Sequence, residues 1–224
     1  MLLANATYRV RPWRNGQGVT RDIAADDGWQ LSLADITRSG RFSDFGDSVR
    51  HFAIVAGAVI LRFAGGRAVA CDPSSPVLVF DGGEAPECEV TEGPAQALNL
   101  IVQAGRFDAR LERLALGAGL ASVSGGEVAG GMQAIFVQSG RIECRTDGAA
   151  PADAGRPMDA GDSFIVTQPL PAARLLLRAV AAGGIRKADA LVARVAPPTS
   201  VNGVAAQRLP AKAPAAGGGR KSVG

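Results

Sequence analysis

The chain is poor in the residues that most metal sites and nucleophilic sites require. Its 224 residues include one histidine, three cysteines and 5% aromatic residues. One histidine excludes every site that needs two or more imidazoles. No apolar run reaches the roughly 20 residues that cross a bilayer, which excludes a membrane protein. The opening residues lack a basic stretch followed by an apolar core, so we expect no secretory signal.

The three cysteines, Cys71, Cys88 and Cys144, cannot all pair with one another. Their scatter fits free, buried thiols in the reducing cytoplasm, and no zinc-ligand spacing joins Cys71 to Cys88. We therefore expect a cytoplasmic protein whose cysteines behave as small apolar side chains.

The formal net charge is +3 and the pI is about 9.0, values that would favour a nucleic-acid partner if spread over a folded surface. However, residues 196–224 hold four basic residues and no acidic one. Subtracting these four charges from +3 leaves about −1 for residues 1–195. Because residues 196–224 are also rich in Ala, Pro and Gly, we expect them to form a disordered basic tail. The near-neutral body then argues against nucleic-acid binding.

Glycine and proline divide the body into short segments with the alternation of β strands. Residues 29–36 alternate, with Trp29, Leu31 and Leu33 on one face. Further strands are expected at 52–55, 59–63, 76–80, 87–90, 98–102, 132–137, 141–145, 163–167 and 174–180. Residues 186–194 are expected to form one or two helical turns. Many short strands with frequent turns indicate an all-β sandwich or barrel.

An internal repeat indicates two units of the same kind. Each unit starts with an apolar strand that ends at a glycine, at residues 52–57 and 133–140. Each ends with a leucine-rich strand, and the offset between the units stays near about 80 residues. This order of strands and Gly turns is typical of a jelly roll of the cupin type. We therefore predict two tandem cupin-like (jelly-roll, germin-like) barrels forming a bicupin, at residues 1–118 and 119–195.

Residues 12–23 hold the densest group of glycine and polar residues. The segment is glycine-rich like a phosphate-binding loop, but no Lys-Ser/Thr pair and no helical pattern follow it, so that interpretation fails. One alternative is a tight hairpin turn, for which the Asn-Gly pair supplies the positive φ angles. The other is a pocket to which Trp13, Asn15, Thr20 and Arg21 present a ring, an amide, a hydroxyl and a guanidinium.

The same block carries a resemblance to a known family. Residues 13–21 read Trp-Arg-Asn-Gly-Gln-Gly-Val-Thr-Arg, and residues 29–35 read Trp-Gln-Leu-Ser-Leu-Ala-Asp. This pattern resembles the opening of the HutD/Ves family, which typically reads Trp-Lys-Asn-Gly-Gly-Gly-Val-Thr-Arg-Glu and then Trp-x-Leu-Ser-x-Ala. Residues 40–45, 49–61 and 98–106 resemble three further segments of that family, so the resemblance covers about residues 8–180.

The chain departs from the family pattern at Gln17, which replaces the middle glycine, at Ala97, where an acid is common, and at His51, where an apolar residue or threonine is usual. The resemblance implies a two-cupin β fold and an association with histidine utilisation or the stress response. It implies no defined catalytic reaction, because the family is regarded as lacking a proven one.

A metal-dependent cupin enzyme is the first alternative function. His51 with a carboxylate such as Glu87 or Glu89 could hold iron or manganese for an isomerase or a dioxygenase, but a facial triad needs two histidines. No Gly-x-Ser-x-Gly elbow supports a nucleophilic triad. We therefore predict no metal, no cofactor and no catalytic residue, and the sequence favours a binding role over catalysis without deciding between them.

A protein-interaction module is the second alternative, in which edge strands or the basic tail contact a partner. Arg106, Arg110 and Arg113 lie near the join of the two halves. We expect these three side chains to be solvated at the rim, with an anion-facing role as the alternative.

The leading hypothesis is a small-molecule binding protein. Polar groups in apolar strands would cost on the order of 1–3 kcal/mol each if buried without partners, so they serve each other, water or a ligand. We predict that the N-terminal barrel binds a small anionic or amide-bearing metabolite, for which the family resemblance suggests urocanate or N-formylglutamate. Arg21 would pair with a carboxylate. The predicted ligand-binding residues are Trp13, Asn15, Thr20, Arg21, Ser32, His51 and Asn99. The expected partner is this metabolite, without nucleic acid or membrane, and a homodimer is an open option.

Overall fold

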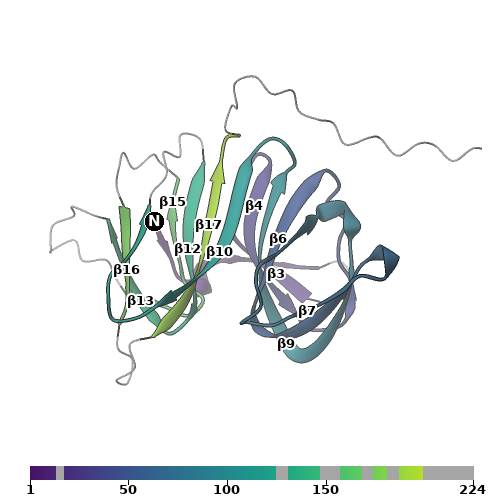
Figure 1. Cartoon of the computed structure of the whole chain (residues 1–224), viewed down its shortest axis with the longest axis horizontal. Coiled ribbons are helices and arrows are strands. Elements are labelled where there is room, and N and C mark those ends of the chain that lie inside the picture. The colour runs from purple at the N-terminus through teal and green to yellow at the C-terminus, as the bar shows by residue number, and fades with distance from the viewer. Residues whose placement is uncertain (14–17, 125–130, 147–156, 168–173, 181–186, 199–224) are drawn as a thin grey trace, which may run out of the picture.

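The computed structural model describes residues 1–13, 18–124, 131–146, 157–167, 174–180 and 187–198. These residues form an all-β structure of three antiparallel sheets (Figure 1). The largest sheet has the order β2 (Arg9–Pro12), β3 (Gly18–Asp26), β4 (Trp29–Ile36), β9 (Glu87–Gln103), β6 (Ser48–Arg62) and β7 (Ala68–Cys71). Two short strands extend it, β5 (Gly40–Arg41) beside β9 and β8 (Leu78–Asp81) beside β6.

The later half of the chain forms most of the other two sheets. The five-stranded sheet has the order β1 (Leu2–Leu3), β15 (Ser163–Val166), β12 (Met132–Ser139), β17 (Ala188–Ala196) and β10 (Asp108–Leu116). The four-stranded sheet has the order β11 (Ala121–Ser124), β16 (Arg174–Ala179), β13 (Arg141–Thr146) and β14 (Met158–Asp159). Three short 3-10 turns complete the described elements: η1 (Asn5–Thr7), η2 (Ala64–Gly66) and η3 (Gly82–Glu84).

Three hydrophobic cores hold these sheets together. The first core joins the eight-stranded and five-stranded sheets, for example through Leu33 and Leu98 on one side and Phe136 and Leu191 on the other. The second core lies on the other face of the eight-stranded sheet, and the third core lies between the five-stranded and four-stranded sheets. Figure 1 shows the result as two lobes, with β13 and β16 at one end of the molecule and β7 and β9 at the other.

The alternation of side chains along β4 explains why both of its faces are buried. Trp29, Leu31 and Leu33 belong to the first core, whereas Ala34 and Ile36 belong to the second. Successive side chains of a strand point to opposite faces, so one strand can serve two cores. The predicted strand at residues 29–36 is therefore found with the predicted face.

The strands β6 and β9 are longer than the sequence indicates. Residues 52–55 and 59–63, expected as separate strands, lie mostly within the single strand β6, and β9 likewise includes both 87–90 and 98–102. The pairing of β6 with β9 shifts register near Gly57, which has a φ of 68°. A Cβ atom at Gly57 would lie 2.4 Å from the carbonyl oxygen of Glu92. Glycine at this position therefore allows a β-bulge, and the strand β6 continues past Gly57 instead of ending there.

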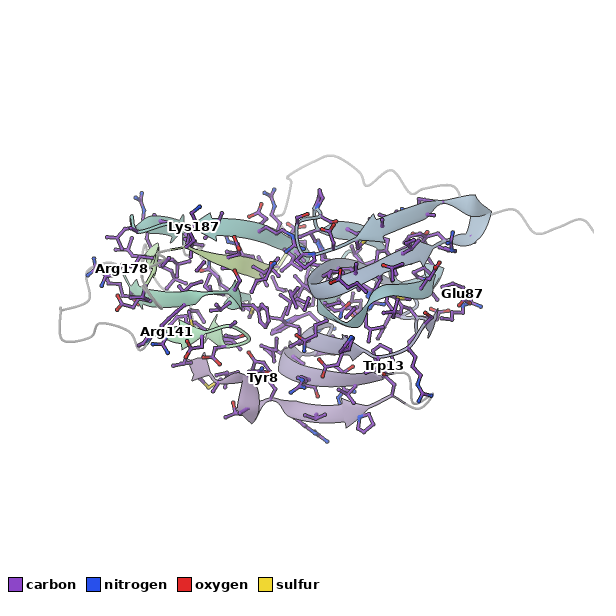
Figure 2. The ribbon with its side chains drawn as sticks, turned by 90° about the horizontal axis from the view of Figure 1, so that it is seen from below. Tyr8, Trp13, Glu87, Arg141, Arg178 and Lys187 are labelled. Atoms are coloured by element: carbon purple, nitrogen blue, oxygen red, sulfur yellow. The ribbon has the colours of Figure 1, made fainter. Side chains whose placement is uncertain are left out.

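Segments from the first half of the chain complete the sheet of the second half. The strand β1 pairs with β15, and β10 pairs with β17 along its whole length. The hydroxyl of Tyr8 donates to the carbonyl oxygen of Gly161 at 2.8 Å and lies 2.7 Å from Ser163 Oγ. Figure 2 shows Tyr8 where the two lobes meet. The division at residues 118 and 195 stays a prediction, with β1 and β10 as strands that cross between the halves.

The expected helical turns at residues 186–194 are wrong, because Ala188–Ala196 forms the strand β17. Its alternate residues Leu191 and Val195 enter the first core, and Ala190 and Val192 enter the third. Burial on both faces hides the two-residue period that identifies a strand. Residues 199–224 of the predicted tail lie outside the described residues. Within the described ranges, no helix has the length and apolar character needed to span a membrane.

Candidate functional site

A cavity of about 530 Å³ opens on the face of the eight-stranded sheet opposite the first core. Its walls come from β2, β3, β4, β6 and β9 together with residues 41–45. This volume lies within the range of small-molecule sites. A second cavity of about 480 Å³ adjoins it and shares Gln30, Phe45 and Ile101 as lining residues.

Strand register brings the central polar groups of the cavity together. Ser32 on β4 lies opposite Asn99 on β9, and Asn99 lies opposite Phe52 on β6. Residues directly opposite each other share a face, and Arg50, two residues before Phe52, is on that face too. Ser32, Asn99 and Arg50 all line the cavity.

Arg50 is a buried cation, with 6% of its surface exposed. Its guanidinium lies 4.4 Å from the ring centroid of Phe42, and the rings of Phe45, Phe52 and Phe80 lie within 5.5–5.7 Å of it. These rings offer their negative faces to the cation but cannot hydrate it. Burial therefore lowers the pKa of Arg50 to about 10, which leaves the side chain charged at neutral pH.

The hydrogen-bond partner of Arg50 is an amide rather than a carboxylate. Its Nε and Nη2 donate to Asn99 Oδ1 at 2.9 and 2.7 Å. Asn99 Nδ2 in turn donates to the carbonyl oxygen of Ala97 at 3.2 Å, which fixes the orientation of the amide. Within the described part of the chain, no acidic side chain forms an ion pair with Arg50.

Trp13 and Thr20 form one wall of the cavity. Trp13 Nε1 donates to Thr20 Oγ1 at 2.8 Å, and the backbone of Trp13 pairs with the carbonyl oxygen of Gly18 at 3.0 Å. A Cβ atom at Gly18 would lie 2.2 Å from the carbonyl oxygen of Asp35 and 3.2 Å from the Trp13 ring. The glycine therefore lets the ring pack against the strand, which explains one glycine of the segment 12–23.

The structure brings four of the seven predicted ligand-binding residues to this cavity: Trp13, Thr20, Ser32 and Asn99. Arg21 follows Thr20 and points to the other face of β3, where its Nε donates to Asp35 Oδ2 at 2.9 Å. Gln96 Nε2 donates to Asp35 Oδ1 at 2.7 Å, so Arg21 belongs to a structural ion pair. Asn15 lies outside the described residues.

His51 also lies away from the cavity. It follows Arg50 on β6 and sits opposite Leu100, a residue of the first core. Only 7% of its surface is exposed, and this burial lowers the pKa of the imidazole. Among the described residues, no three His, Cys, Asp or Glu side chains are grouped so as to hold a metal ion.

Sequence reasoning missed Arg50, Arg41 and the phenylalanines around Arg50. The available signal was an arginine inside an apolar strand, in Val-Arg-His-Phe at residues 49–52. The next residue, His51, is the single histidine of the chain and was predicted as a ligand-binding residue instead of Arg50. Its side chain lies on the opposite face of β6.

Three comparisons with known proteins bear on this chain. The HutD family model matches residues 5–184. An uncharacterized 21.2 kDa protein in the hutC 3′ region of Pseudomonas putida is 34% identical over 123 residues, which is 50% of this chain. The match spans 62% of the length of that relative.

Solved structures resemble the whole described fold. A conserved protein of unknown function from Pseudomonas aeruginosa PAO1 has a TM-score of 0.72 and 25% identity, over 89% of this chain and 99% of the other. HutD from Pseudomonas fluorescens SBW25, in a formate condition, has a TM-score of 0.70 and 21% identity with the same coverage of both chains. A Cupin 2 conserved barrel domain protein from Leptotrichia buccalis has a TM-score of 0.56 and 10% identity over 87% of this chain and 96% of the other. The last two structures have low sequence identity to this chain and show similarity of fold alone. This fold is cupin-like.

Proposed function

The chain belongs to the HutD family, and from that membership we propose that it binds a small anionic or amide-bearing metabolite as an accessory or regulatory protein of histidine utilisation. The site is the cavity around Arg50 and Asn99, and it works without a metal. The proposed architecture is a bicupin of two tandem cupin-like barrels, of which the N-terminal one holds the ligand. The proposed setting is the cytoplasm, where Cys71, Cys88 and Cys144 stay as buried free thiols.

The observation that carries this proposal is the buried charge of Arg50. A charged group inside a protein is costly unless it is paired, and removing its hydration is only partly offset by four aromatic rings. Asn99 supplies hydrogen bonds but no negative charge. An anionic ligand would provide the missing charge, and a planar carboxylate matches the planar guanidinium.

Neutral polar groups next to Arg50 suit the rest of such a ligand. The hydroxyl of Ser32 and the amide of Gln30 line the same cavity, and Thr20 can donate its hydroxyl hydrogen while it accepts from Trp13. These groups can orient an amide, formyl or imidazole moiety beside a carboxylate. Urocanate and N-formylglutamate both combine a carboxylate with such a moiety, which supports them as candidates.

Formate is the smallest probe of the proposed anion site, since it carries a carboxylate and nothing else. The similar structure of HutD from Pseudomonas fluorescens was determined in a formate condition. The experiment measures binding of formate, urocanate and N-formylglutamate by calorimetry and by thermal shift. A ligand at about a hundredfold excess over its dissociation constant is expected to stabilise the protein by about 2.7 kcal/mol.

Two arginines of the same strand provide the test and its control. Arg50→Gln removes the buried charge and should weaken binding by at least about tenfold, or about 1.4 kcal/mol. Arg62→Gln removes an exposed arginine that pairs with Glu89 and should leave binding unchanged. Arg50→Lys keeps a positive charge and checks that any loss does not come from misfolding. No stabilisation by any of the three ligands at millimolar concentration would disprove the proposed function.

A further inference from the structure

We infer that residues 208–212 of this chain dock on the second cavity, the one of about 480 Å³ that adjoins the Arg50 cavity. Asp26, Phe45, Asp47, Ser48 and Gln103 are among its lining residues. The occupant is a segment of the same chain that lies beyond the described residues. The inference goes beyond the proposed function, because it concerns a different cavity and does not depend on any ligand at Arg50.

The second cavity carries negative charge, whereas the Arg50 cavity carries positive charge. Asp26 and Asp47 line it, and among the described residues no lysine or arginine does so. Neither carboxylate forms an ion pair within the described ranges of the chain. The nearby Arg106 is already engaged, because its Nη2 donates to Asp27 Oδ2 at 2.6 Å. Two negative charges are therefore available to a positively charged occupant.

The same cavity offers a hydroxyl and an aromatic ring to its occupant. Ser48 is 8% exposed and lies opposite Gln103 in the pairing of β6 with β9, and both residues line the cavity. Ser48 Oγ has no hydrogen-bond partner among the described residues, and a buried hydroxyl without a partner is costly. Phe45 is 39% exposed, an unusual position for so large an apolar side chain. An occupant with hydrogen-bond donors and apolar atoms would satisfy both residues.

Residues 208–212 have the chemistry that this lining requires. They read Arg-Leu-Pro-Ala-Lys, and residues 196–224 contain no acidic side chain. Arg208 and Lys212 can each pair with one of the two aspartates, and either can donate a further hydrogen bond to the serine hydroxyl. Between them, Leu209 and Pro210 supply the apolar atoms that can cover the phenylalanine ring. The segment therefore matches the cavity in charge, in hydrogen bonding and in apolar contact.

The last strand ends close to the second cavity. Ala196, the final residue of β17, lies opposite Asp108 at the start of β10, and Figure 1 shows these two strands side by side. Phe107, the residue before β10, packs against Gly28 of the cavity lining, because a Cβ atom at Gly28 would lie 2.9 Å from the ring. The chain from Ala196 to Arg208 can span about 40 Å when extended, so Arg208 can reach the cavity.

The covalent connection makes such a contact effective. Exposed ion pairs are individually weak, so residues 208–212 would bind poorly as a separate peptide. A short connection raises the local concentration of the segment to the millimolar range. A segment whose dissociation constant as a free peptide is about 0.1 mM would then be docked in about tenfold excess over the undocked state.

The experiment digests the full-length chain with trypsin at low ionic strength and follows cleavage by mass spectrometry. Trypsin cuts after Arg208 and Lys212, which the inference places in the cavity. It also cuts after Arg220 and Lys221, which the inference leaves undocked and which serve as an internal control. Each rate is divided by the rate in a synthetic peptide of residues 199–224. We expect the normalised rate after Arg208 and Lys212 to be about tenfold lower than after Lys221, because trypsin cuts the undocked population.

Substitutions of the cavity test where the segment docks. Asp26→Asn combined with Asp47→Asn should abolish the protection, and so should about 1 M salt, which screens charges beyond about 3 Å. Asparagine at position 26 keeps the side-chain oxygen that accepts from the backbone N–H of Asp27, so the fold should be unaffected, which urea denaturation checks. Glu87→Gln is the control, because Glu87 is exposed at the outer end of the same lobe and lines neither cavity (Figure 2). This variant should keep the full protection.

Three results would overturn the inference. Equal normalised rates at all four cleavage sites would show that residues 208–212 do not dock. Protection that survives in the Asp26→Asn, Asp47→Asn double variant would place the segment elsewhere. Protection that falls on dilution would show that the segment binds a second copy of the chain. Because no anionic ligand is used, these results leave the proposed function standing, and failure of ligand binding at Arg50 would leave this inference standing.

Discussion

The Arg50 guanidinium directs two hydrogen bonds, from Nε and Nη2, onto the single oxygen Asn99 Oδ1 at 2.9 and 2.7 Å. An aspartate at position 99 would present nearly the same shape, but it would also cancel the charge. The amide therefore fixes the orientation of the guanidinium and leaves its positive charge for a ligand. This relationship makes the choice between amide and carboxylate at position 99 a direct test of the site.

Asn99→Asp is expected to stabilise the ligand-free protein and to weaken anion binding. The new carboxylate would pair with Arg50 in a buried setting, where hydrogen bonds between charged groups contribute about 1.5–3 kcal/mol. The same carboxylate would repel an anionic ligand, so affinity for formate should fall at least about tenfold. Urea denaturation and calorimetry measure the two effects.

Ser32→Ala is the matched control for this substitution, because Ser32 lies directly opposite Asn99 and lines the same cavity. It removes a hydroxyl without adding charge, so it should change affinity for formate by less than the aspartate does. Equal formate affinity in Asn99→Asp and the wild type would show that Arg50 does not hold the anion.

Much of the fold follows from patterns that a single sequence displays. The strand at 29–36 has apolar side chains on alternate positions, and the HutD resemblance rested on residues 13–21, of which Trp13 and Thr20 line the cavity. The long strands β6 and β9 could not be predicted at full length, because glycine normally ends a strand and here supports a bulge at Gly57. The strand β17 could not be predicted, because alternate residues enter two different cores. Its apolar residues therefore do not alternate with polar ones in the way that identifies a strand.

The site was predictable in composition but not in geometry. Ser32 and Asn99 stood out as polar residues in apolar strands, and the register places them directly opposite each other. The faces of Arg21 and His51 could not be assigned, because a strand whose two sides are both covered gives no sequence sign of which side holds a pocket. Arg21 satisfies Asp35 on one face, while Arg50 occupies the cavity on the other face of the sheet.

His51→Gln is expected to make the protein less sensitive to mild acid. Burial lowers the pKa of His51 below its ordinary value of 6.5, so the unfolded chain binds the proton more readily than the folded one. The stabilisation that comes from keeping His51 neutral is complete above about pH 6.5 and is lost as the pH falls through the lower pKa of the folded state. The unfolding free energy of the wild type should therefore decline from pH 6.5 towards pH 5 more steeply than that of the variant.

Affinity for formate provides the second readout for His51. Because His51 faces the first core and not the cavity, His51→Gln should leave this affinity unchanged from pH 6 to pH 8. Urea denaturation at several pH values and calorimetry at two of them are sufficient. A drop in affinity without a change in the acid profile would mean that the imidazole reaches the ligand.

Gly18→Ala is expected to lower both stability and ligand affinity. The added Cβ atom would lie 2.2 Å from the carbonyl oxygen of Asp35, so the backbone or Trp13 must move, at a cost of about 1–3 kcal/mol. Movement of the Trp13 ring would open one wall of the cavity. Gly117→Ala is the control, because a Cβ atom there meets no heavy atom within 4 Å. Equal stability and affinity in the two variants would contradict the packing of Trp13 against Gly18.

Arg113→Met is expected to destabilise the protein by about 1.5–3 kcal/mol and to leave ligand affinity unchanged. Arg113 was expected at a solvated rim, but it is half-buried and its guanidinium donates to the carbonyl oxygens of Ser75 and Ile54 at 2.7 and 2.8 Å and to Gln138 Oε1. It thus ties β6 and the segment before β8 to β12 of the other lobe, and the variant would leave these acceptors without a donor. Arg110 on the same strand is exposed and lies 3.9 Å from Glu112, so Arg110→Met should change the unfolding free energy by less than about 0.5 kcal/mol. Chemical denaturation of both variants measures the difference, and similar small losses in both would show that Arg113 does not connect the lobes.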